Sequence, residues 1–318
     1  MIRFEGVTKR FPGADRPAVE ALDLTVAEGT TCALIGPSGC GKSTTLRMVN
    51  RLIEPEAGRI RIGGRDISAT DPVTLRRGIG YVLQGVGLFP HRSVAQNVAT
   101  VPALLGWSRA RIAARVDAML DLVGLDPAQF RERRPDALSG GQRQRVGVAR
   151  ALAADPAILL MDEPFGAVDP IARTRLQAEI GAILQRLRKT VLLVTHDIGE
   201  ALRMGDQVAL MRDGRLVQTA SPDRLLAAPA DAFAADFLGG GRSLRRLARL
   251  RAGDFAQPGT LDGTAETMAE EASLQDALDR MLATGTCRVA IGDRILTLDV
   301  VRNAAQAVPE QDGAGQVP

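Results

Sequence analysis

The sequence of 318 residues is poor in aromatic residues, cysteine and histidine, and each shortage argues against a class of function. Aromatic residues make up 3% of the chain, which disfavours a platform on which single-stranded bases stack. The three cysteines, Cys32, Cys40 and Cys287, have neither the number nor the spacing of a disulfide framework or a metal site. Two histidines are too few for a histidine cluster, and no apolar run approaches the roughly 18 residues of a membrane-spanning helix.

The charges are nearly balanced, which argues against nucleic acid as a partner. Lysine and arginine together number 40 and the acids 37, so that the net charge is +3. Apolar residues make up 45% of the chain, which is close to globular averages and excludes wholesale disorder. Residues 1–6 include an acid and lack the apolar core of a secretory signal. We therefore expect no nucleic-acid partner and a cytoplasmic, reducing location.

Hydrophobic patterning predicts an α/β fold. Residues 2–7 alternate between apolar and polar as a strand does. Three short runs are apolar on both faces and precede helical patterns: 31–35, 157–161 and 190–194. Such runs are typical of buried parallel strands joined by crossover helices. Segment 93–123 instead predicts two helices inserted in the α/β core, and 206–220 predicts two strands around Asp213-Gly214.

The composition changes near residue 239, where three consecutive glycines form a flexible break. Residues 222–238, just before it, predict one or two short helices. We expect four segments: a main domain over 1–238, a Gly- and Arg-rich linker over 239–262, a small apolar-patterned segment over 263–302 and a flexible tail over 303–318. The five arginines within 242–251 fit either a solvated helical linker or a segment that lies on anionic lipid.

A phosphate-binding pattern directly follows the predicted strand 31–35. It fits G-x-x-x-x-G-K-S/T and leads into a helical stretch over 42–52. Its glycines let backbone N–H groups turn toward phosphates, and the helix directs its positive end at them. Because the chain has three lysines, a chance match that includes Lys42 is rare. We expect Lys42 to bridge the β- and γ-phosphates and Ser43 to hold Mg²⁺. The candidate nucleotide-binding residues are Gly36, Pro37, Ser38, Gly39, Cys40, Gly41, Lys42, Ser43 and Thr44.

Polar residues follow two further predicted strands. Asp162 and Glu163 follow the run 157–161, and His196 follows the run 190–194. Because the carboxyl ends of parallel strands meet at one edge of a sheet, we expect a single crevice there. Asp162 is expected to coordinate Mg²⁺, and Glu163 to orient or deprotonate an attacking water. His196 is expected to bond the γ-phosphate and to hold Glu163, whereas capping of the next helix is an alternative role for the acids.

The helix that follows Ser139 is a second candidate anion-binding end. Ser139 is suited to be its N-cap, and the next residues are Gly140, Gly141 and Gln142. Such an end exposes N–H groups to an anion. From composition alone, an ordinary capped helix explains the segment more often. Both explanations stay open on these residues by themselves.

These motifs, in this order and spacing, resemble those of ATP-binding cassette (ABC) ATPases over about residues 1–238: 36–43, 138–142, 161–164 and 195–197. The resemblance implies a P-loop cassette with a parallel-sheet core, an antiparallel β subdomain and a helical signature subdomain. It implies hydrolysis of ATP with Mg²⁺, held by Ser43, Gln84 and Asp162. It also implies a homodimer in which Ser139, Gly140, Gly141 and Gln142 act on ATP that the other copy holds.

Three more roles follow from the resemblance. Gln84 matches the Q-loop glutamine, which touches Mg²⁺ and reports the nucleotide state to a membrane partner through helices near 84–137. Phe11 matches the aromatic residue that stacks on adenine, with a core position in the first hairpin as the alternative. Asp169 matches the D-loop aspartate. Apart from these roles, His91 is expected in a loop near the partner-facing surface, with a purely structural role as an equal alternative.

Shorter segments look like those of the ATPase subunits of quaternary-amine importers: 87–91, 101–107, 165–170 and 195–201. That resemblance implies uptake of a glycine betaine, choline, carnitine or proline-type osmoprotectant through a separate permease, with an external solute-binding protein. It places the chain peripherally on the cytoplasmic face of the cell membrane. Gly85 departs from the polar residue expected after Gln84.

One alternative function is that of an importer of amino acids, sulfonates or a thio-betaine. Another is an ABC protein acting on DNA or ribosomes, but the tandem cassettes or long inserts typical of that class are absent from this sequence.

Residues 272–301 resemble one cystathionine-β-synthase (CBS) motif, with a helix followed by two strands. Such motifs normally work in pairs, and this sequence has one. We therefore expect a small, degenerate CBS-like appendage that regulates activity or contacts a second copy.

Overall fold

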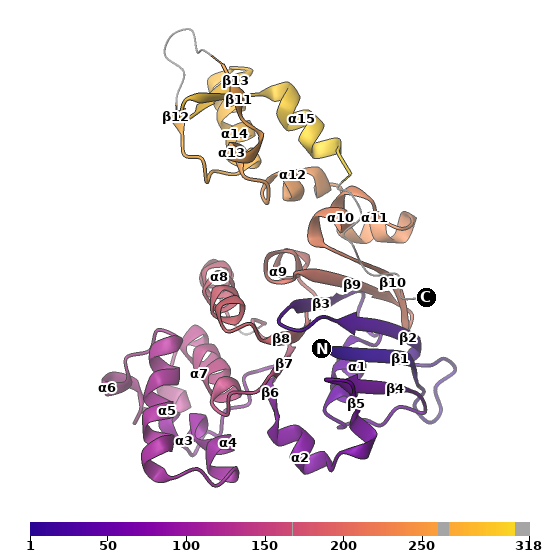
Figure 1. Ribbon diagram of the computed structural model, residues 1–318, viewed down its shortest axis with the longest axis vertical. Coiled ribbons are helices and arrows are strands. Elements are labelled where there is room, and N and C mark those ends of the chain that lie inside the picture. Colours follow the sequence, from indigo (N-terminus) through magenta and orange to yellow (C-terminus); the bar gives the residue numbers. More distant parts are fainter. Residues whose placement is uncertain (167, 260–266, 309–318) are drawn as a thin grey trace. The chain divides into compact units, whose positions relative to one another are not determined.

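The computed structural model describes residues 1–166, 168–259 and 267–308. By its internal contacts the chain divides into two compact units, Met1–Thr219 and Ala220–Pro318 (Figure 1). Several predicted features lie partly outside the described residues. These are Ala167 of the predicted D-loop motif, 260–262 of the predicted linker, 263–266 of the CBS-like segment and 309–318 of the tail.

A six-stranded sheet organises the first unit. Its strand order is β10-β9-β3-β8-β7-β6, and β3 pairs in parallel with both β8 and β9, while β7 pairs in parallel with β6 and β8. Every residue of β3, β7 and β8 is buried, which confirms the prediction of doubly covered parallel strands. The strands are β3 (Thr31–Ile35), β6 (Ile79–Val82), β7 (Ile158–Asp162), β8 (Thr190–Val194), β9 (Gln207–Arg212) and β10 (Arg215–Ala220).

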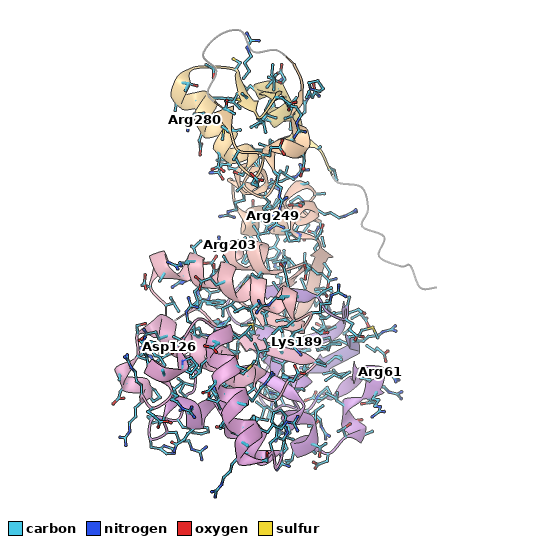
Figure 2. All side chains as sticks on the ribbon, turned by 60° about the vertical axis from the view of Figure 1, so that its left-hand side comes forward. Arg61, Asp126, Lys189, Arg203, Arg249 and Arg280 are labelled. Carbon is cyan, nitrogen blue, oxygen red and sulfur yellow. The ribbon has the colours of Figure 1, made fainter. Side chains whose placement is uncertain are left out.

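A smaller antiparallel sheet, in the order β2-β1-β4-β5, packs on the same core. Burial alternates from Leu22 to Val26 along β2, as one solvated face requires. On the exposed side, Arg61 Nε lies 3.2 Å from Glu5 Oε2, a cross-strand pair (Arg61 is labelled in Figure 2). The core beneath joins this sheet to the main one through the helix α1 (Lys42–Val49). The strands are β1 (Ile2–Lys9), β2 (Val19–Val26), β4 (Ala57–Ile62) and β5 (Arg65–Asp66).

Helices gather beside the edge strand β6 (Figure 1). Segment 93–123 forms three helices rather than the predicted two: Gly106, at φ +73°, separates α4 from α5, and a further break at Ala99 separates α3 from α4, where Pro102 has no N–H to donate to Val98. The described helices of this unit after α1 are α2 (Pro72–Arg77), α3 (Val94–Val98), α4 (Thr100–Leu104), α5 (Arg109–Leu122), α6 (Pro127–Phe130), α7 (Gly140–Leu152), α8 (Pro170–Arg186) and α9 (Ile198–Met204), with 3₁₀ turns at Ile67–Ala69 and Pro135–Ala137.

The second unit has its own core and sheet, in the order β11-β14-β13-β12. The expected linker over 239–262 is corrected for its described residues: Leu247 and Ala252 are buried in this core, and β11 pairs with β14. The helix α15 also extends to Gln306, into the expected tail. The elements are α10 (Pro222–Ala227), α11 (Ala232–Leu238), α12 (Arg242–Leu247), α13 (Ala252–Phe255), β11 (Gln257–Pro258), β12 (Thr267–Met268), α14 (Leu274–Thr284), β13 (Arg288–Ile291), β14 (Arg294–Thr297) and α15 (Leu298–Gln306).

Candidate nucleotide-binding site

The loop between β3 and α1 requires glycine at two close approaches. Gly36 has a φ of +147°, and a Cβ there would lie 2.2 Å from the carbonyl oxygen of Met211. Gly41, at φ +104°, would place a Cβ 2.2 Å from the carbonyl oxygen of Ala18. Neither position has room for a side chain, so both glycines of the sequence pattern are structural requirements of the loop.

Lys42, the first residue of α1, is 7% exposed. Its Nζ donates to Gly36 O at 2.8 Å and to Pro37 O at 2.9 Å, and it lies 3.7 Å from Cys40 Sγ. No carboxylate pairs with Lys42 among the ion pairs of the described residues, so its charge is directed to the loop itself. An ammonium in this position is suited to phosphate oxygens. Pro37, Ser38 and Gly39 form the exposed tip of the loop, and Thr44 is half-buried on α1.

Ser43 and Asp162 meet across the sheet edge. The Oγ of Ser43 donates to Oδ1 of Asp162 at 3.2 Å, and Arg47 Nη2 lies 3.9 Å from the other oxygen. Asp162 is 2% exposed, and this burial raises the pKa of its carboxyl above the ordinary value. A buried carboxylate gains from a nearby cation, and oxygen donors are those that Mg²⁺ prefers. The pair therefore fits a magnesium ion.

Glu163 is contacted by two of the other predicted residues. Gln84 Nε2 donates to Glu163 Oε2 at 2.9 Å, and His196 Nδ1 lies 3.5 Å from the same oxygen. Glu163 itself has a φ of +44°, a strained value for a residue with a side chain, and its N–H donates to Val194 O at 2.9 Å. The backbone thus turns the Glu163 carboxylate away from Asp162 and toward Gln84 and His196.

A buried network that the sequence analysis missed supports the loop around His196. Thr195 Oγ1 donates to Glu200 Oε2 at 3.0 Å and accepts from the Asp197 N–H at 3.0 Å, so the backbone on both sides of His196 is fixed. Glu200 is 4% exposed, and burial raises the pKa of its carboxyl to about 7. Its position three residues after Asp197, whose Oδ1 accepts its N–H, is the sequence signal that could have found it.

The same network reaches the neighbouring helix. Gln177 of α8, which is fully buried, donates to Glu200 Oε2 at 3.4 Å. Arg203 of α9, labelled in Figure 2, donates through Nη2 to Gln177 Oε1 at 2.6 Å. Asp169 caps the start of α8, where its Oδ1 accepts the N–H of Ala172 at 2.9 Å. The helix that begins at the predicted D-loop is therefore tied to the helix that follows His196.

Two other predicted features lie apart from these contacts. Ser139 caps α7 in a capping box with Gln142, so the capped-helix description holds, and the action of Gly140 and Gly141 on a nucleotide stays a prediction. Phe11 is 39% exposed, which corrects the alternative that placed it in the core. The Lys9 Nζ lies 5.6 Å from its ring centroid.

Comparisons with known proteins identify the family. The model of the ABC transporter family matches residues 19–166. The osmoprotectant import ATP-binding protein OsmV of Salmonella typhimurium is 51% identical over 86% of this chain and 72% of its own length. The glycine betaine uptake system ATP-binding protein YehX of Escherichia coli is 51% identical over 91% of this chain and 92% of its own length. This chain belongs to the ABC transporter family.

A solved structure agrees with this assignment. The dimeric ATP-binding cassette MJ0796, in a post-hydrolysis state with ADP and Pi, is 31% identical and has a TM-score of 0.62. It covers 70% of this chain, which in turn covers 99% of that cassette. The predictions of the family, of the α/β cassette fold and of an ATPase are therefore confirmed.

A groove of about 330 Å³ lies on the cassette beside β6. Its lining includes Tyr81, Leu83 and Gly87, together with Thr100 and Val101 of α4. Phe89, 39% exposed, also lines it, and His91 lies in the same loop, 6.0 Å from the Phe89 ring between centroids. The groove, which Arg76, Arg77 and Arg150 also line, is thus a mostly apolar surface that reaches Leu83, the residue before Gln84. Among the described residues, no helix combines the length and the apolar character that crossing a bilayer requires.

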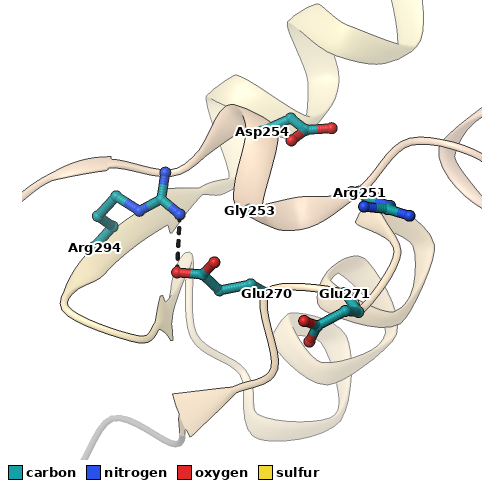
Figure 3. A pocket seen from close by; sticks show the side chains of 6 residues that line it. All are labelled: Arg251, Gly253, Asp254, Glu270, Glu271 and Arg294. Carbon is teal, nitrogen blue, oxygen red and sulfur yellow. Dashed lines mark hydrogen bonds and ion pairs between the residues drawn. The ribbon is translucent and has the colours of Figure 1, made fainter.

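The second unit has a different kind of pocket, of about 230 Å³, lined by charges of both signs (Figure 3). Arg294 Nη2 lies 3.0 Å from Glu270 Oε1, so these two charges are paired with each other. The CBS-like character of this unit stays a prediction. The pocket is lined by Arg251, Gly253, Asp254, Glu270, Glu271 and Arg294.

Proposed function

We propose that this chain is the ATP-hydrolysing subunit of an importer for a quaternary-amine osmoprotectant of the glycine betaine, choline, carnitine or proline type. The contact of Gln84 and His196 with Glu163, beside the Ser43–Asp162 pair, carries the ATPase part. The 51% identity to OsmV and YehX, which are named for osmoprotectant import and glycine betaine uptake, supports the solute class.

In the proposed reaction, Glu163 acts as the general base. A water oxygen attacks the γ-phosphorus, a new O–P bond forms, and the bond to the β–γ bridging oxygen breaks. The Glu163 carboxylate accepts the proton of the water, while the Gln84 amide and the His196 imidazole hold that carboxylate in place. Lys42 binds the phosphate oxygens, and Phe11, exposed at the start of the chain, stacks on adenine.

Ser43, Asp162 and Gln84 would hold Mg²⁺, which when bound supplies positive charge to the phosphate oxygens. The buried Ser43–Asp162 pair supports this assignment, because its carboxylate has few solvent contacts to stabilise its charge.

Two copies of the chain are proposed to pair head to tail. The Ser139–Gly141 end of one copy would then complete the nucleotide site of the other, with Asp169 at the same interface. The open space beside Gly141 supports this, since a Cβ there would meet nothing within 4 Å. The dimeric state of the MJ0796 cassette supports the pairing further.

The importer also requires a membrane permease and an external solute-binding protein. We place the permease on the apolar groove beside Gln84, because an exposed apolar surface next to a catalytic loop suits a partner that senses the nucleotide state. This assigns the chain to the cytoplasmic face of the cell membrane as a peripheral subunit.

The solute is tested on the chain purified with its permease and solute-binding protein in lipid discs. Glycine betaine, choline, carnitine and proline are added one at a time, with an amino acid, a sulfonate and a thio-betaine as comparison solutes. We expect a trimethylammonium compound to raise the ATPase rate most. Stimulation by a comparison solute alone would contradict the proposed solute class.

The ATPase chemistry is tested with Glu163→Gln. We expect the variant to bind ATP with parental affinity, to hydrolyse it at least about 100-fold more slowly and to accumulate as an ATP-bound dimer in light scattering. Asp155→Asn is the matched control, because Asp155 is an exposed carboxylate in the same unit that pairs with Lys189. Parental turnover by Glu163→Gln would remove Glu163 as the base.

A further inference from the structure

The loop after β6, residues 84–87, is held by a buried arginine of α7. Arg150 donates from Nη1 to Gly87 O at 2.7 Å and from Nη2 to Val86 O at 2.9 Å. It is 8% exposed, and burial lowers the pKa of its guanidinium. The ion pairs found among the described residues do not include Arg150, so the two loop carbonyls are its partners.

The same helix face receives a side chain of the loop. A Cβ at Gly147, one turn before Arg150, would lie 2.9 Å from Val86 Cγ1, closer than such atoms approach. Val86 is 4% exposed and has a φ of +69°, a strained conformation for a β-branched residue. Such a conformation persists where its surroundings fix it. Here α7 does so, because Gly147 leaves space for the Val86 side chain and Arg150 donates to the Val86 carbonyl.

This attachment connects two parts of the proposed ATPase site. Gln84, two residues before Val86, donates to Glu163 at 2.9 Å. Ser139 caps the other end of α7, the helix that carries Arg150. Because an intact helix moves as a rigid body, a displacement at its Ser139 end is carried to the loop that Arg150 holds.

We propose that Arg150 is a positioning residue for ATP hydrolysis. Together with Gly147, it fastens residues 84–87 to α7, so that Gln84 takes its place against Glu163 when the Ser139 end of α7 is in position. The inference rests on the proposed ATPase function and adds to it a residue that touches neither the nucleotide nor Glu163. It also explains why glycine, rather than a polar residue, follows Gln84. Gly85 has a φ of +72° and begins the run of left-handed residues that brings Val86 to α7.

The first test compares Arg150→Gln with Arg115→Gln in the full chain. Arg115 of α5 is a matched control, because it too donates to two backbone carbonyls, Leu152 O at 2.9 Å and Ala153 O at 2.8 Å, at the end of α7. We expect Arg150→Gln to lower kcat on the order of tenfold with the KM for ATP within about twofold of the parent. Arg115→Gln should keep the parental kcat. Equal losses of kcat in the two variants would overturn the proposal.

A second pair of variants tests the attachment of residues 84–87 to α7 even if Arg150→Gln fails to fold. Gly147→Ala presses a methyl group against Val86 Cγ1, and Val86→Ala removes that atom. We expect Gly147→Ala alone to lower kcat several-fold, about three to tenfold, and the double variant to return to within about twofold of Val86→Ala. Losses of kcat that simply multiply would overturn the proposal.

Glu163→Gln, measured in parallel, separates this inference from the function on which it rests. If Glu163→Gln keeps the parental rate, the proposed chemistry fails whatever Arg150 does. If Glu163→Gln is inactive while Arg150→Gln and Arg115→Gln behave alike, the ATPase stands and the positioning role fails.

Discussion

The sheet edge of the first unit and the charged pocket of the second unit both collect charged side chains, but in different ways. At the sheet edge, the hydrogen bond from Ser43 to Asp162 spans 119 positions of the sequence, and Asp162 is almost fully buried. In the pocket, the bond from Arg294 to Glu270 spans 24 positions, and the Glu270 side chain is 57% exposed. Groups brought together at the sheet edge are thus held by the fold, whereas those of the pocket meet at the surface.

The difference matters for what each place can bind. An ion pair between charges that stay in water contributes little to stability, typically 0–1 kcal/mol. A buried group such as Asp162 or Lys42 is costly unless a partner compensates it, so its retention points to a ligand. By this criterion the sheet edge meets the physical requirement for binding a ligand, whereas in the pocket Arg294 and Glu270 compensate each other at the surface.

The largest effect expected from this comparison is the loss of ATP binding in Lys42→Ala. Removing the buried ammonium leaves phosphate charge without its partner, so we expect the Kd for ATP to rise about 100-fold or more. Titration calorimetry measures this directly. Lys189→Ala is the control, because Lys189 pairs with Asp155 at 2.8 Å in the same unit and should leave ATP affinity unchanged. An unchanged Kd in Lys42→Ala would remove the phosphate-binding role of the loop.

A smaller effect tests whether the two units are independent. A chain that ends at residue 219 retains the whole first unit, and we expect it to bind ATP with parental affinity. A chain that ends at residue 262 keeps Leu247 and Ala252 but lacks the strands and helices that bury them, so we expect it to aggregate. Gel filtration of both chains is the measurement. A monodisperse chain ending at 262 would restore the linker that the sequence predicts over 239–262.

Much of the site could be predicted because apolar runs fix where strands end. Asp162, Glu163 and His196 follow the buried strands β7 and β8, and parallel pairing then requires them to share one edge of the sheet. The motif that contains Lys42 likewise depends on local sequence alone. These parts needed no knowledge of distant contacts, which is why periodicity and spacing sufficed.

The parts that escaped prediction depend on tertiary burial. Arg150 is one of many arginines, and its sequence neighbours give no sign that it is buried against the loop around Val86. Gly147 was the available signal, since a glycine inside a helix usually has a packing reason. The Arg-rich stretch 242–251 suggests a solvated segment, but Leu247 on it is buried, and composition averages over such a face.

The smallest effect concerns the response of stability to pH. Burial raises the pKa of Glu200 from an ordinary 4.5 to about 7, with the nearby Asp197 charge adding to the rise and Thr195 and the arginines of α8 and α9 opposing it. Because the folded state holds this proton more tightly, the stabilisation is complete below about pH 4.5. It is lost as the pH rises from about 4.5 toward 7.

Fluorescence of Trp107, the single tryptophan of the chain, reports unfolding of the first unit. We expect urea titrations of Glu200→Gln to show a flatter dependence of the unfolding free energy on pH between 4.5 and 7 than the parent shows. Glu270→Gln, in the pocket of the second unit, should leave the Trp107 transition unchanged, because its exposed ion pair is worth less than about 1 kcal/mol and belongs to a separate core. If Glu200→Gln keeps the parental slope, the buried network behind His196 does not hold a proton, and the contrast between buried and surface charge loses its energetic basis at this position.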